Sequence, residues 1–253
     1  MIGSSKKLLK AAAGAAGGGV LRGFEWDDRD TDPSTPLTNI GIEAGDTPLW
    51  LANASYDLND YTGNPGAAPY VSTTGDGMTV HYKANCPGGG RATGVATLPY
   101  GSGDSYLDGT ETSVYNSSGM DQFWDRNTNV MLVVFAGSWD IQEVNNNAFD
   151  YPNKYSSYLT YRSGTPQLSA NAGDLIVSVN FAVGPYNGTI TSYTLPSGYE
   201  DPQEGTVYFD NQQYDKIITF GYKISEGGTE SGAISYNNNP NGEVDFLIRF
   251  SPA

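Results

Sequence analysis

Two residues set the first limits on the chemistry of this chain, because it contains one histidine, His81, and one cysteine, Cys86. Zinc sites built on paired histidines, such as HExxH, and multi-cysteine zinc or iron–sulfur sites are therefore excluded. A Cys86 nucleophile would need His81 as its base, and the sequence offers no third group to orient that histidine. We interpret His81 as a strand residue and Cys86 as a turn residue, and we predict no catalytic residue.

The densest acidic cluster contains a spacing that can bind calcium. Asp28, Asp30 and Asp32 are spaced like the carboxylates at positions 1, 3 and 5 of an EF-hand loop. The pattern then fails, since Pro33 stands where that loop needs glycine and Asn39 stands where it needs glutamate. These three aspartates remain a calcium candidate outside the EF-hand class. The preferred interpretation is a solvated linker, with no metal site and no cofactor.

A second carboxylate group consists of Glu200, Asp201 and Glu204, directly after a Pro-Ser-Gly turn. Glycosidases need two carboxylates about 5 to 10 Å apart across a sugar. Acidic turns satisfy this condition on paper very often, so glycan hydrolysis stays a minor alternative.

Tyrosine is abundant, with 18 residues, and four of them crowd one polar stretch: Tyr151, Tyr155, Tyr158 and Tyr161. A tyrosine ring combines an apolar face with a polar tip and is favoured at interfaces. The alternative is that these rings pack long loops onto the body. Both interpretations stay open, and the four residues are candidates for a surface or oligomer contact.

The net charge is −15, from 13 Lys and Arg against 28 Asp and Glu. Nucleic-acid binding depends on basic side chains that neutralise phosphates, so we predict no nucleic-acid partner. No apolar run reaches the roughly 18 to 20 residues of a membrane-spanning helix, and no membrane span is predicted.

The first 23 residues differ from the rest, because they hold four basic residues and no acidic one. The run from Ser4 to Ala13 predicts a short helix, which a serine can cap and which ends before Gly17. A secretory signal peptide is the competing interpretation, but Lys10 interrupts the apolar region that such a peptide requires.

This opening, MIGSSKKLLKAAAGAAGG, resembles the start of many virion proteins of tailed bacteriophages, especially marine phages. The resemblance covers less than a tenth of the chain. It implies a phage origin and a peptide that docks the protein to the particle, with Lys6, Lys7, Leu8, Leu9 and Lys10 as docking residues. It supplies no catalytic residue. A looser resemblance to β-sandwich domains of phage appendage proteins rests on the stretches 174–181, 195–199 and 222–223.

The remaining sequence predicts strands. Ile218, Phe220 and Tyr222 alternate with polar residues, as in an antiparallel sheet that is solvated on one side. Similar signals recur in the same order in both halves: Ala-Gly-Asp at 44–46 and 172–174, Tyr-Lys at 82–83 and 222–223, and a closing strand at 130–135 and 244–250. We therefore predict an all-β protein with two tandem antiparallel β-sandwiches of jelly-roll type after a short N-terminal helix. The predicted divisions are a docking peptide 1–23, an acidic linker 24–38, a first sandwich 39–139, a connector 140–164 and a second sandwich 165–253.

These features predict a non-enzymatic virion protein, made in the bacterial host cytoplasm and anchored to the particle by its N-terminus. Its sandwiches would decorate the capsid or neck, or act as a tail-associated fibre or adhesin. The predicted partners are other virion proteins, further copies of the chain in a homo-oligomer with a trimer favoured, and a host-surface glycan. The alternatives are a secreted carbohydrate-binding module and, less favoured, a glycan depolymerase.

Overall fold

The computed structural model describes residues 19–28, 43, 45–55, 70–71, 79–86, 91–97, 114–115, 128–146, 164–183, 190–205, 216–238 and 242–253. All regular secondary structure in these residues is β-strand, and every strand pairing is antiparallel. The predicted all-β class is therefore confirmed. The predicted helix at 4–13 lies outside the described residues.

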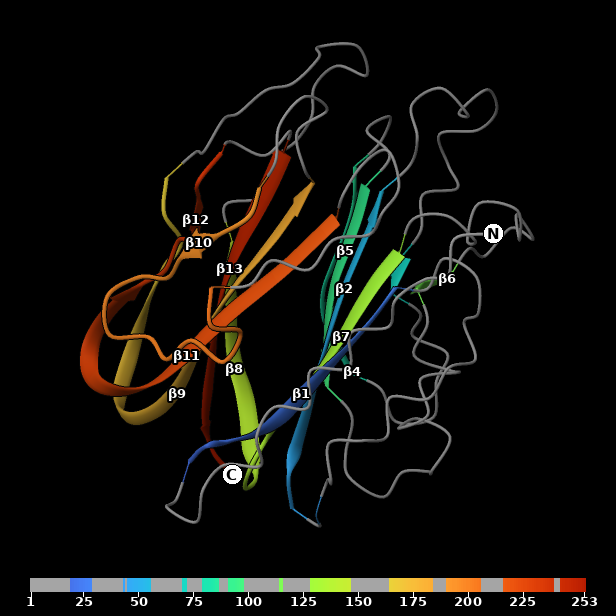
Figure 1. Cartoon of the computed structure of the whole chain (residues 1–253). Coiled ribbons are helices and arrows are strands. Elements are labelled where there is room, and N and C mark those ends of the chain that lie inside the picture. Colours follow the sequence, from blue (N-terminus) through green and yellow to red (C-terminus); the bar gives the residue numbers. More distant parts are fainter. Residues whose placement is uncertain are drawn as a thin grey trace, which may run out of the picture.

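The strands form two larger sheets that face each other (Figure 1). The first sheet has the order β1 (Leu21–Asp28), β7 (Thr128–Phe135), β2 (Thr47–Ser55), β5 (Arg91–Thr97) and β4 (Thr79–Cys86). The second has the order β11 (Lys216–Ser231), β9 (Gln167–Val183), β13 (Gly242–Pro252) and β8 (Trp139–Asn146). Two short pairs are β10 (Tyr193–Thr194) with β12 (Ser235–Tyr236) and β3 (Tyr70–Val71) with β6 (Val114–Tyr115).

One hydrophobic core lies between the two sheets. The predicted alternation holds, since Phe220, Tyr222 and Ile248 all point into this core. Rings from opposite sheets meet there: the centroids of Phe135 and Phe250 are 5.9 Å apart. In the described part of the chain, each half therefore supplies one sheet of a common sandwich, which differs from the predicted pair of separate sandwiches. The reason is that, among the described strands, the apolar faces of the two sheets cover each other and share one cluster of buried residues.

The internal repeat is real at two of its signals and accidental at the third. Asp46 directly precedes β2 and Asp174 lies within β9 at its bend, and each of these strands pairs with the closing strand of its half. Tyr82 and Tyr222 do not correspond, because β4 is two strands away from β2, whereas β11 pairs directly with β9. The Tyr-Lys match therefore reflects composition.

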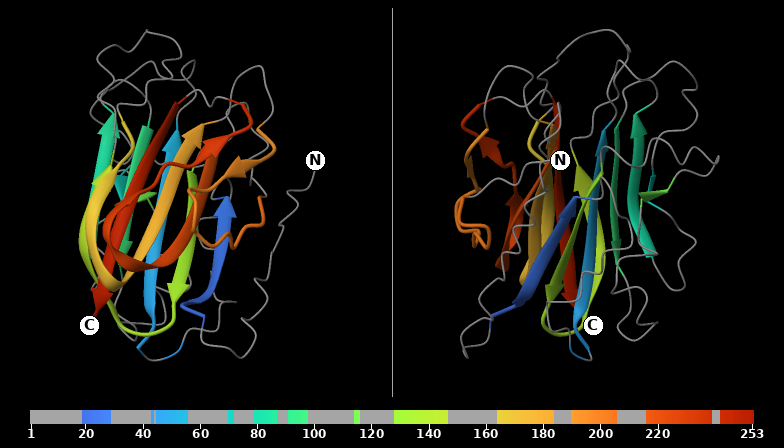
Figure 2. Two further views of the ribbon diagram at one scale, coloured as in Figure 1. Left: turned by 90° about the vertical axis from the view of Figure 1, so that its left-hand side faces the viewer. Right: turned by 45° about the vertical axis from the view of Figure 1, so that its right-hand side comes forward.

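The outer face of the second sheet is covered, although we expected it to be solvated. β9 and β11 bend together at Gly173 and Gly227, which have φ of +95° each, and their far ends curl back over the sheet (Figure 2). Leu168 from this curl packs against Leu247 on the outer face. Next to the curl, the segment 234–236 contacts a buried polar row on β11, β9 and β13, formed by Thr219, Asn180 and Asp245.

Each edge strand of the two large sheets has an irregular pairing, whereas the three pairings between interior strands are regular. One extra residue stands in three of the edge strands: Arg22 in β1, His81 in β4 and Gln142 in β8. In the fourth case β9 carries the extra residue opposite Ser225 of β11. Bulges twist an edge and discourage another chain from adding a strand to it. The described sheets are thus built to end at their edges.

Two predicted boundaries are wrong. The docking peptide was predicted to extend to Gly23, but Leu21 to Gly23 belong to β1 and pair with β7. The predicted connector 140–164 begins inside β8, an edge strand of the second sheet. In both places a strand begins at a polar or glycine-containing stretch that resembles a linker in composition.

Candidate functional site

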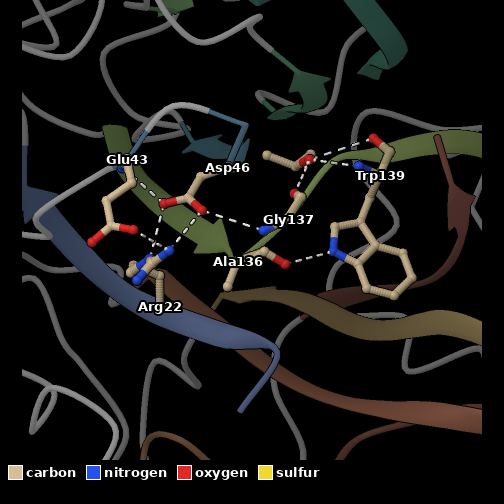
Figure 3. Close-up of polar contacts among 7 residues, drawn as sticks. Arg22, Glu43, Asp46, Ala136, Gly137 and Trp139 are labelled. Atoms are coloured by element: carbon tan, nitrogen blue, oxygen red, sulfur yellow. Dashed lines mark hydrogen bonds and ion pairs between the residues drawn. The ribbon is translucent and has the colours of Figure 1, made fainter. Parts of the chain in front are cut away.

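The best-defined polar site lies where β1 begins and the two sheets are joined (Figure 3). Arg22 is the bulged residue of β1, so its side chain leaves the regular register and reaches Asp46 at the start of β2. Its Nε and Nη2 atoms donate to the two carboxylate oxygens of Asp46, at 2.9 Å each. A second ion pair joins Arg22 to the more exposed Glu43 at 3.0 Å. We call Arg22, Glu43, Asp46 and Gly137 the strand latch.

Asp46 is the centre of the strand latch, and its side chain is only 2% exposed. Besides Arg22, the backbone N–H groups of Glu43 and Gly137 donate to its carboxylate, at 2.8 and 3.3 Å. Burial alone raises the pKa of this carboxyl, but the hydrogen bonds from Arg22 and from these two N–H groups outweigh burial and hold the pKa below its ordinary value. With its pKa lowered, Asp46 is ionised near neutral pH, and its contacts give it a structural role.

A short turn connects the two sheets beside the strand latch. Residues 136–138 link β7 of the first sheet to β8 of the second. The hydroxyl of Thr47 donates to the carbonyl of Gly137 at 3.0 Å and accepts from the N–H of Trp139 at 2.9 Å. The indole of Trp139 donates back to the carbonyl of Ala136 at 2.9 Å. The latch therefore ties β1 to the turn that joins β7 of the first sheet to β8 of the second.

A second polar cluster lies on the outer face of the second sheet. Lys223 forms an ion pair with Glu230, and its ammonium lies 5.0 Å from the ring centre of Tyr199. Burial raises the pKa of Glu230, but hydrogen bonds from Lys223 and Ser225 outweigh it, and the pKa lies below its ordinary value. Burial, and then the charge of Glu230, raise the pKa of the Tyr199 hydroxyl. The ion pair between Lys223 and Glu230 therefore joins two parts of β11 on either side of its bend.

The predicted carboxylate group at 200–204 serves the fold. Asp201 accepts hydrogen bonds from the N–H groups of Gln203 and Gly205, at 3.0 and 2.9 Å, and so caps its own turn. Glu200 accepts from the hydroxyl of Tyr222 at 2.6 Å. Both carboxylates are therefore engaged with the turn or with β11. In a glycosidase, by contrast, the two carboxylates would face a sugar.

The same segment also covers the edge of β11. The side-chain amide of Gln203 accepts from the N–H of Phe220 at 2.9 Å and donates to the carbonyl of Ile218 at 3.2 Å. The backbone of Glu200 exchanges two hydrogen bonds with Tyr222. These contacts satisfy groups that an edge strand otherwise leaves open to another chain.

The structure gives partial answers for the residues singled out from the sequence. Asp28 is the last residue of β1 and pairs with Asn129, so one member of the calcium candidate lies in a strand. His81 is the bulged residue of β4, and Cys86 ends that strand opposite Arg91. The other candidates lie outside the described residues: Asp30, Asp32, the docking residues Lys6, Lys7, Leu8, Leu9 and Lys10, and the tyrosines Tyr151, Tyr155, Tyr158 and Tyr161.

Within the described ranges, no three His, Cys, Asp or Glu side chains come together as a metal-binding group. None of the described elements is a helix long and apolar enough to cross a membrane. The strand latch was missed by sequence reasoning, since Arg22 and Asp46 are 24 residues apart and Arg22 was assigned to the docking peptide. The available sequence signal was the glycine before the aspartate, Gly45, which has a φ of +87° in the structure.

No protein-family model, no curated protein sequence and no solved structure matches this chain.

Proposed function

We propose that this chain is a non-enzymatic structural protein of a tailed-phage particle. Its basic N-terminal segment docks to another virion protein, and the β-sandwich body is displayed as a capsid or neck decoration or as a tail-associated adhesin. This proposal takes its phage origin from the resemblance of residues 1–18 to virion proteins.

The observation that carries the proposal is the way the basic segment joins the body. A docking peptide can retain a body only if the connection to the fold is strong. Here the segment leads directly into β1, which pairs with β7 from Leu21 to Asp28 and is fixed by the ion pairs of Arg22. Strands pulled along their length must break many hydrogen bonds together, so this attachment suits a tether.

The corrected boundary changes the charge available for docking. Arg22 is engaged with Asp46 in the body, so residues 1–18 provide Lys6, Lys7 and Lys10 and no acidic residue, or +3. The rest of the chain then has 10 basic and 28 acidic residues, or −18. A basic peptide favours an acidic docking partner. The attraction between this peptide and the acidic body of a second copy is weak at a distance, since salt screens such contacts beyond about 8 Å.

We propose a homo-oligomer, with a trimer favoured, because several docking peptides on one assembly bind at high effective concentration. The irregular edges of the sheets argue for contact through other surfaces than strand addition. The tyrosines at 151–161 are the first candidates for that contact.

Particle incorporation tests the proposal directly. Full-length protein and a variant lacking residues 2–18 are expressed during infection of the host, and purified particles are analysed by mass spectrometry. We expect full-length protein with an intact N-terminus in the particles and loss of the truncated variant. Cleavage near Ala16 with export from the host would favour the secreted module, and release of reducing sugar ends from host polysaccharide would favour the depolymerase; either result contradicts the proposal.

A further inference from the structure

Among the described strands, the chain changes from one large sheet to the other once, at the turn 136–138. The strands β1, β2, β4, β5 and β7 precede this turn and form the first sheet, whereas β8, β9, β11 and β13 follow it and form the second. The two short pairs obey the same division, since β3 pairs with β6 and β10 pairs with β12. Every described strand pairing therefore joins two strands of the same half, and Figure 1 shows the two large sheets as separate layers.

Apolar side chains join the two halves across the core. The ring centroids of Phe24 and Phe220 are 5.3 Å apart, and those of Phe135 and Tyr222 are 6.0 Å apart. Such contacts require the two apolar faces to meet, but they do not require both sheets to belong to one chain. If two copies exchanged their sheets reciprocally, the same faces would be buried and the same rings would meet.

The turn therefore decides whether a sheet packs on its own chain or on a second copy. Gly137 stands in the middle of the turn with a φ of +88°, a conformation that glycine adopts at no steric cost. Its N–H donates to Asp46, and its carbonyl accepts from the hydroxyl of Thr47. The N–H of Ala136 donates to the carbonyl of Val20 at 2.7 Å. These contacts hold the turn against the first sheet in its closed shape.

We infer that the two sheets of this protein can be exchanged between two copies of the chain, and that the strand latch and the turn 136–138 keep them within one copy. In the exchanged dimer, the strands before the turn in each copy pack on the strands after the turn in the other copy. The open turn reaches at most about 14 Å from Phe135 to Trp139, so the two exchanged sandwiches lie side by side. The inference goes beyond the proposed docking function and does not depend on it.

The balance between the two forms depends on the turn and on protein concentration, because the core is the same in both. Gly137→Ala keeps the N–H that binds Asp46, and its added Cβ lies at an ordinary contact distance, 3.6 Å, from Nε1 of Trp139. Alanine is strained at this positive φ, and opening the turn relieves the strain in both copies. After full-length protein is unfolded and refolded at equal concentrations, we expect the ratio of dimer to monomer to rise at least about tenfold over the wild type. Light scattering on the separated fractions measures it.

A matched control and a second variant accompany this test. Gly173→Ala introduces the same kind of strain, at a φ of +95° with nothing within 4 Å of the added Cβ, but Gly173 lies inside the second half. Its ratio of dimer to monomer should stay at the wild-type value. Thr47→Val removes the hydroxyl that binds Gly137 and Trp139 and keeps the size of the side chain, so it should raise the ratio without strain at Gly137.

Contacts between rings show whether the dimer is an exchanged one. Gly137→Ala protein with isotope-labelled phenylalanine is refolded together with an equal amount of unlabelled protein, and nuclear Overhauser effects between labelled and unlabelled chains are recorded. We expect such effects between Phe24 and Phe220 in the dimer and none in the monomer, because these rings come from opposite sheets. A dimer without them is joined through its outer surface and overturns the exchange. An equal rise of the dimer in Gly173→Ala, or no rise in both Gly137→Ala and Thr47→Val, overturns the role of the turn.

Discussion

Asp46 and Asp174 make the same local contact on the two sheets of the sandwich. Each follows a glycine with positive φ, +87° at Gly45 and +95° at Gly173. Each accepts a hydrogen bond of 2.8 Å from the backbone N–H three residues earlier in the chain. The two then differ, because Asp46 binds Arg22 of β1, whereas Asp174 accepts from the hydroxyl of Ser251 at 2.9 Å. One of two similar turns has thus become the attachment point of the N-terminal strand.

This difference predicts unequal effects of two matched substitutions. Asp46→Ala removes four hydrogen bonds and leaves Arg22 without its buried partner, so we expect a loss of about 2 to 3 kcal/mol in unfolding free energy. Asp174→Ala removes two neutral-donor hydrogen bonds and should cost about 1 to 2 kcal/mol. Urea unfolding of both variants measures the difference. Equal losses would show that the Arg22 pair adds no stability beyond the shared turn.

The strand latch also predicts where the docking peptide can be cut. Deletion of residues 2–18 removes none of the described contacts of the body, so its thermal midpoint should stay within about 2 °C of the wild type, which corresponds to at most about 1 kcal/mol. Deletion of residues 2–22 removes Val20, Arg22 and the bulge of β1, and should lower the midpoint by several degrees. Scanning calorimetry compares the two. A midpoint that falls equally in both deletions contradicts the boundary drawn at Gly19.

Acid should weaken the fold through Asp46 and Glu230. Both carboxyls have a pKa below the ordinary value in the folded protein, so the folded state binds fewer protons than the unfolded state and stability rises with pH. Their contribution is complete above the ordinary values of 3.8 and 4.5 and is lost as pH falls below them. The urea midpoint should therefore be level near pH 6 and fall below about pH 4.5. The double variant Asp46→Asn/Glu230→Gln should show a shallower fall, and an unchanged slope contradicts this assignment.

The sequence was a good guide to strands and a poor guide to how the strands combine. Period-two alternation at 218–222 and 246–250 depends only on which side of a sheet is buried, and the core confirms it. Whether two sheets belong to one sandwich or to two depends on contacts such as Phe135 with Phe250, which are 115 positions apart and leave no local signal. The part of the outer face under Leu168 is covered because of the bends at Gly173 and Gly227, which a strand pattern alone does not reveal.

The strand latch shows the same limit at the level of a site. The glycine before Asp46 predicts a turn, but the partner of the carboxylate depends on the bulge at Arg22. A bulge is one extra residue in an otherwise regular strand, and the basic composition before Gly23 drew Arg22 into the docking peptide instead. Composition alone therefore does not reveal where β1 begins.

Alkali should reveal two tyrosines that resist ionisation. Burial, reinforced by the carboxylates of Glu230 and Glu200, raises the pKa of Tyr199 and Tyr222 above the ordinary value of 10.0. Because the folded pKa is raised, their contribution to stability is complete below pH 10 and declines as pH rises beyond it. Phenolate absorbance of native protein at pH 11 should therefore lack these residues until the protein unfolds. The double variant Tyr199→Phe/Tyr222→Phe should lose the late signal, and a single ionisation step for all tyrosines contradicts the prediction.

The contact between β11 and the segment 195–200 predicts a strong effect of one methyl group. A Cβ added at Gly221 would lie 2.5 Å from Cδ1 of Leu195 and 3.1 Å from the carbonyl oxygen of Glu200. Gly221 has no positive φ, so the effect of Gly221→Ala comes from crowding alone. We expect a loss of about 1 to 3 kcal/mol in unfolding free energy. Gly19→Ala is the matched control, since nothing lies within 4 Å of its added Cβ.

A second substitution separates crowding from any other cause. The closest atoms to the added methyl belong to the side chain of Leu195, which can be shortened, whereas the carbonyl of Glu200 is held by its pairing with Tyr222. Leu195→Ala alone should destabilise the protein, because Leu195 packs against the buried cluster of Ile190, Tyr193 and Ile234. The unfolding free energy lost by the double variant should be smaller than the sum of the two single losses by at least about 0.5 kcal/mol, since the shortened side chain leaves room for the methyl group. Strictly additive losses would mean that the segment 195–200 does not press on β11 at Gly221.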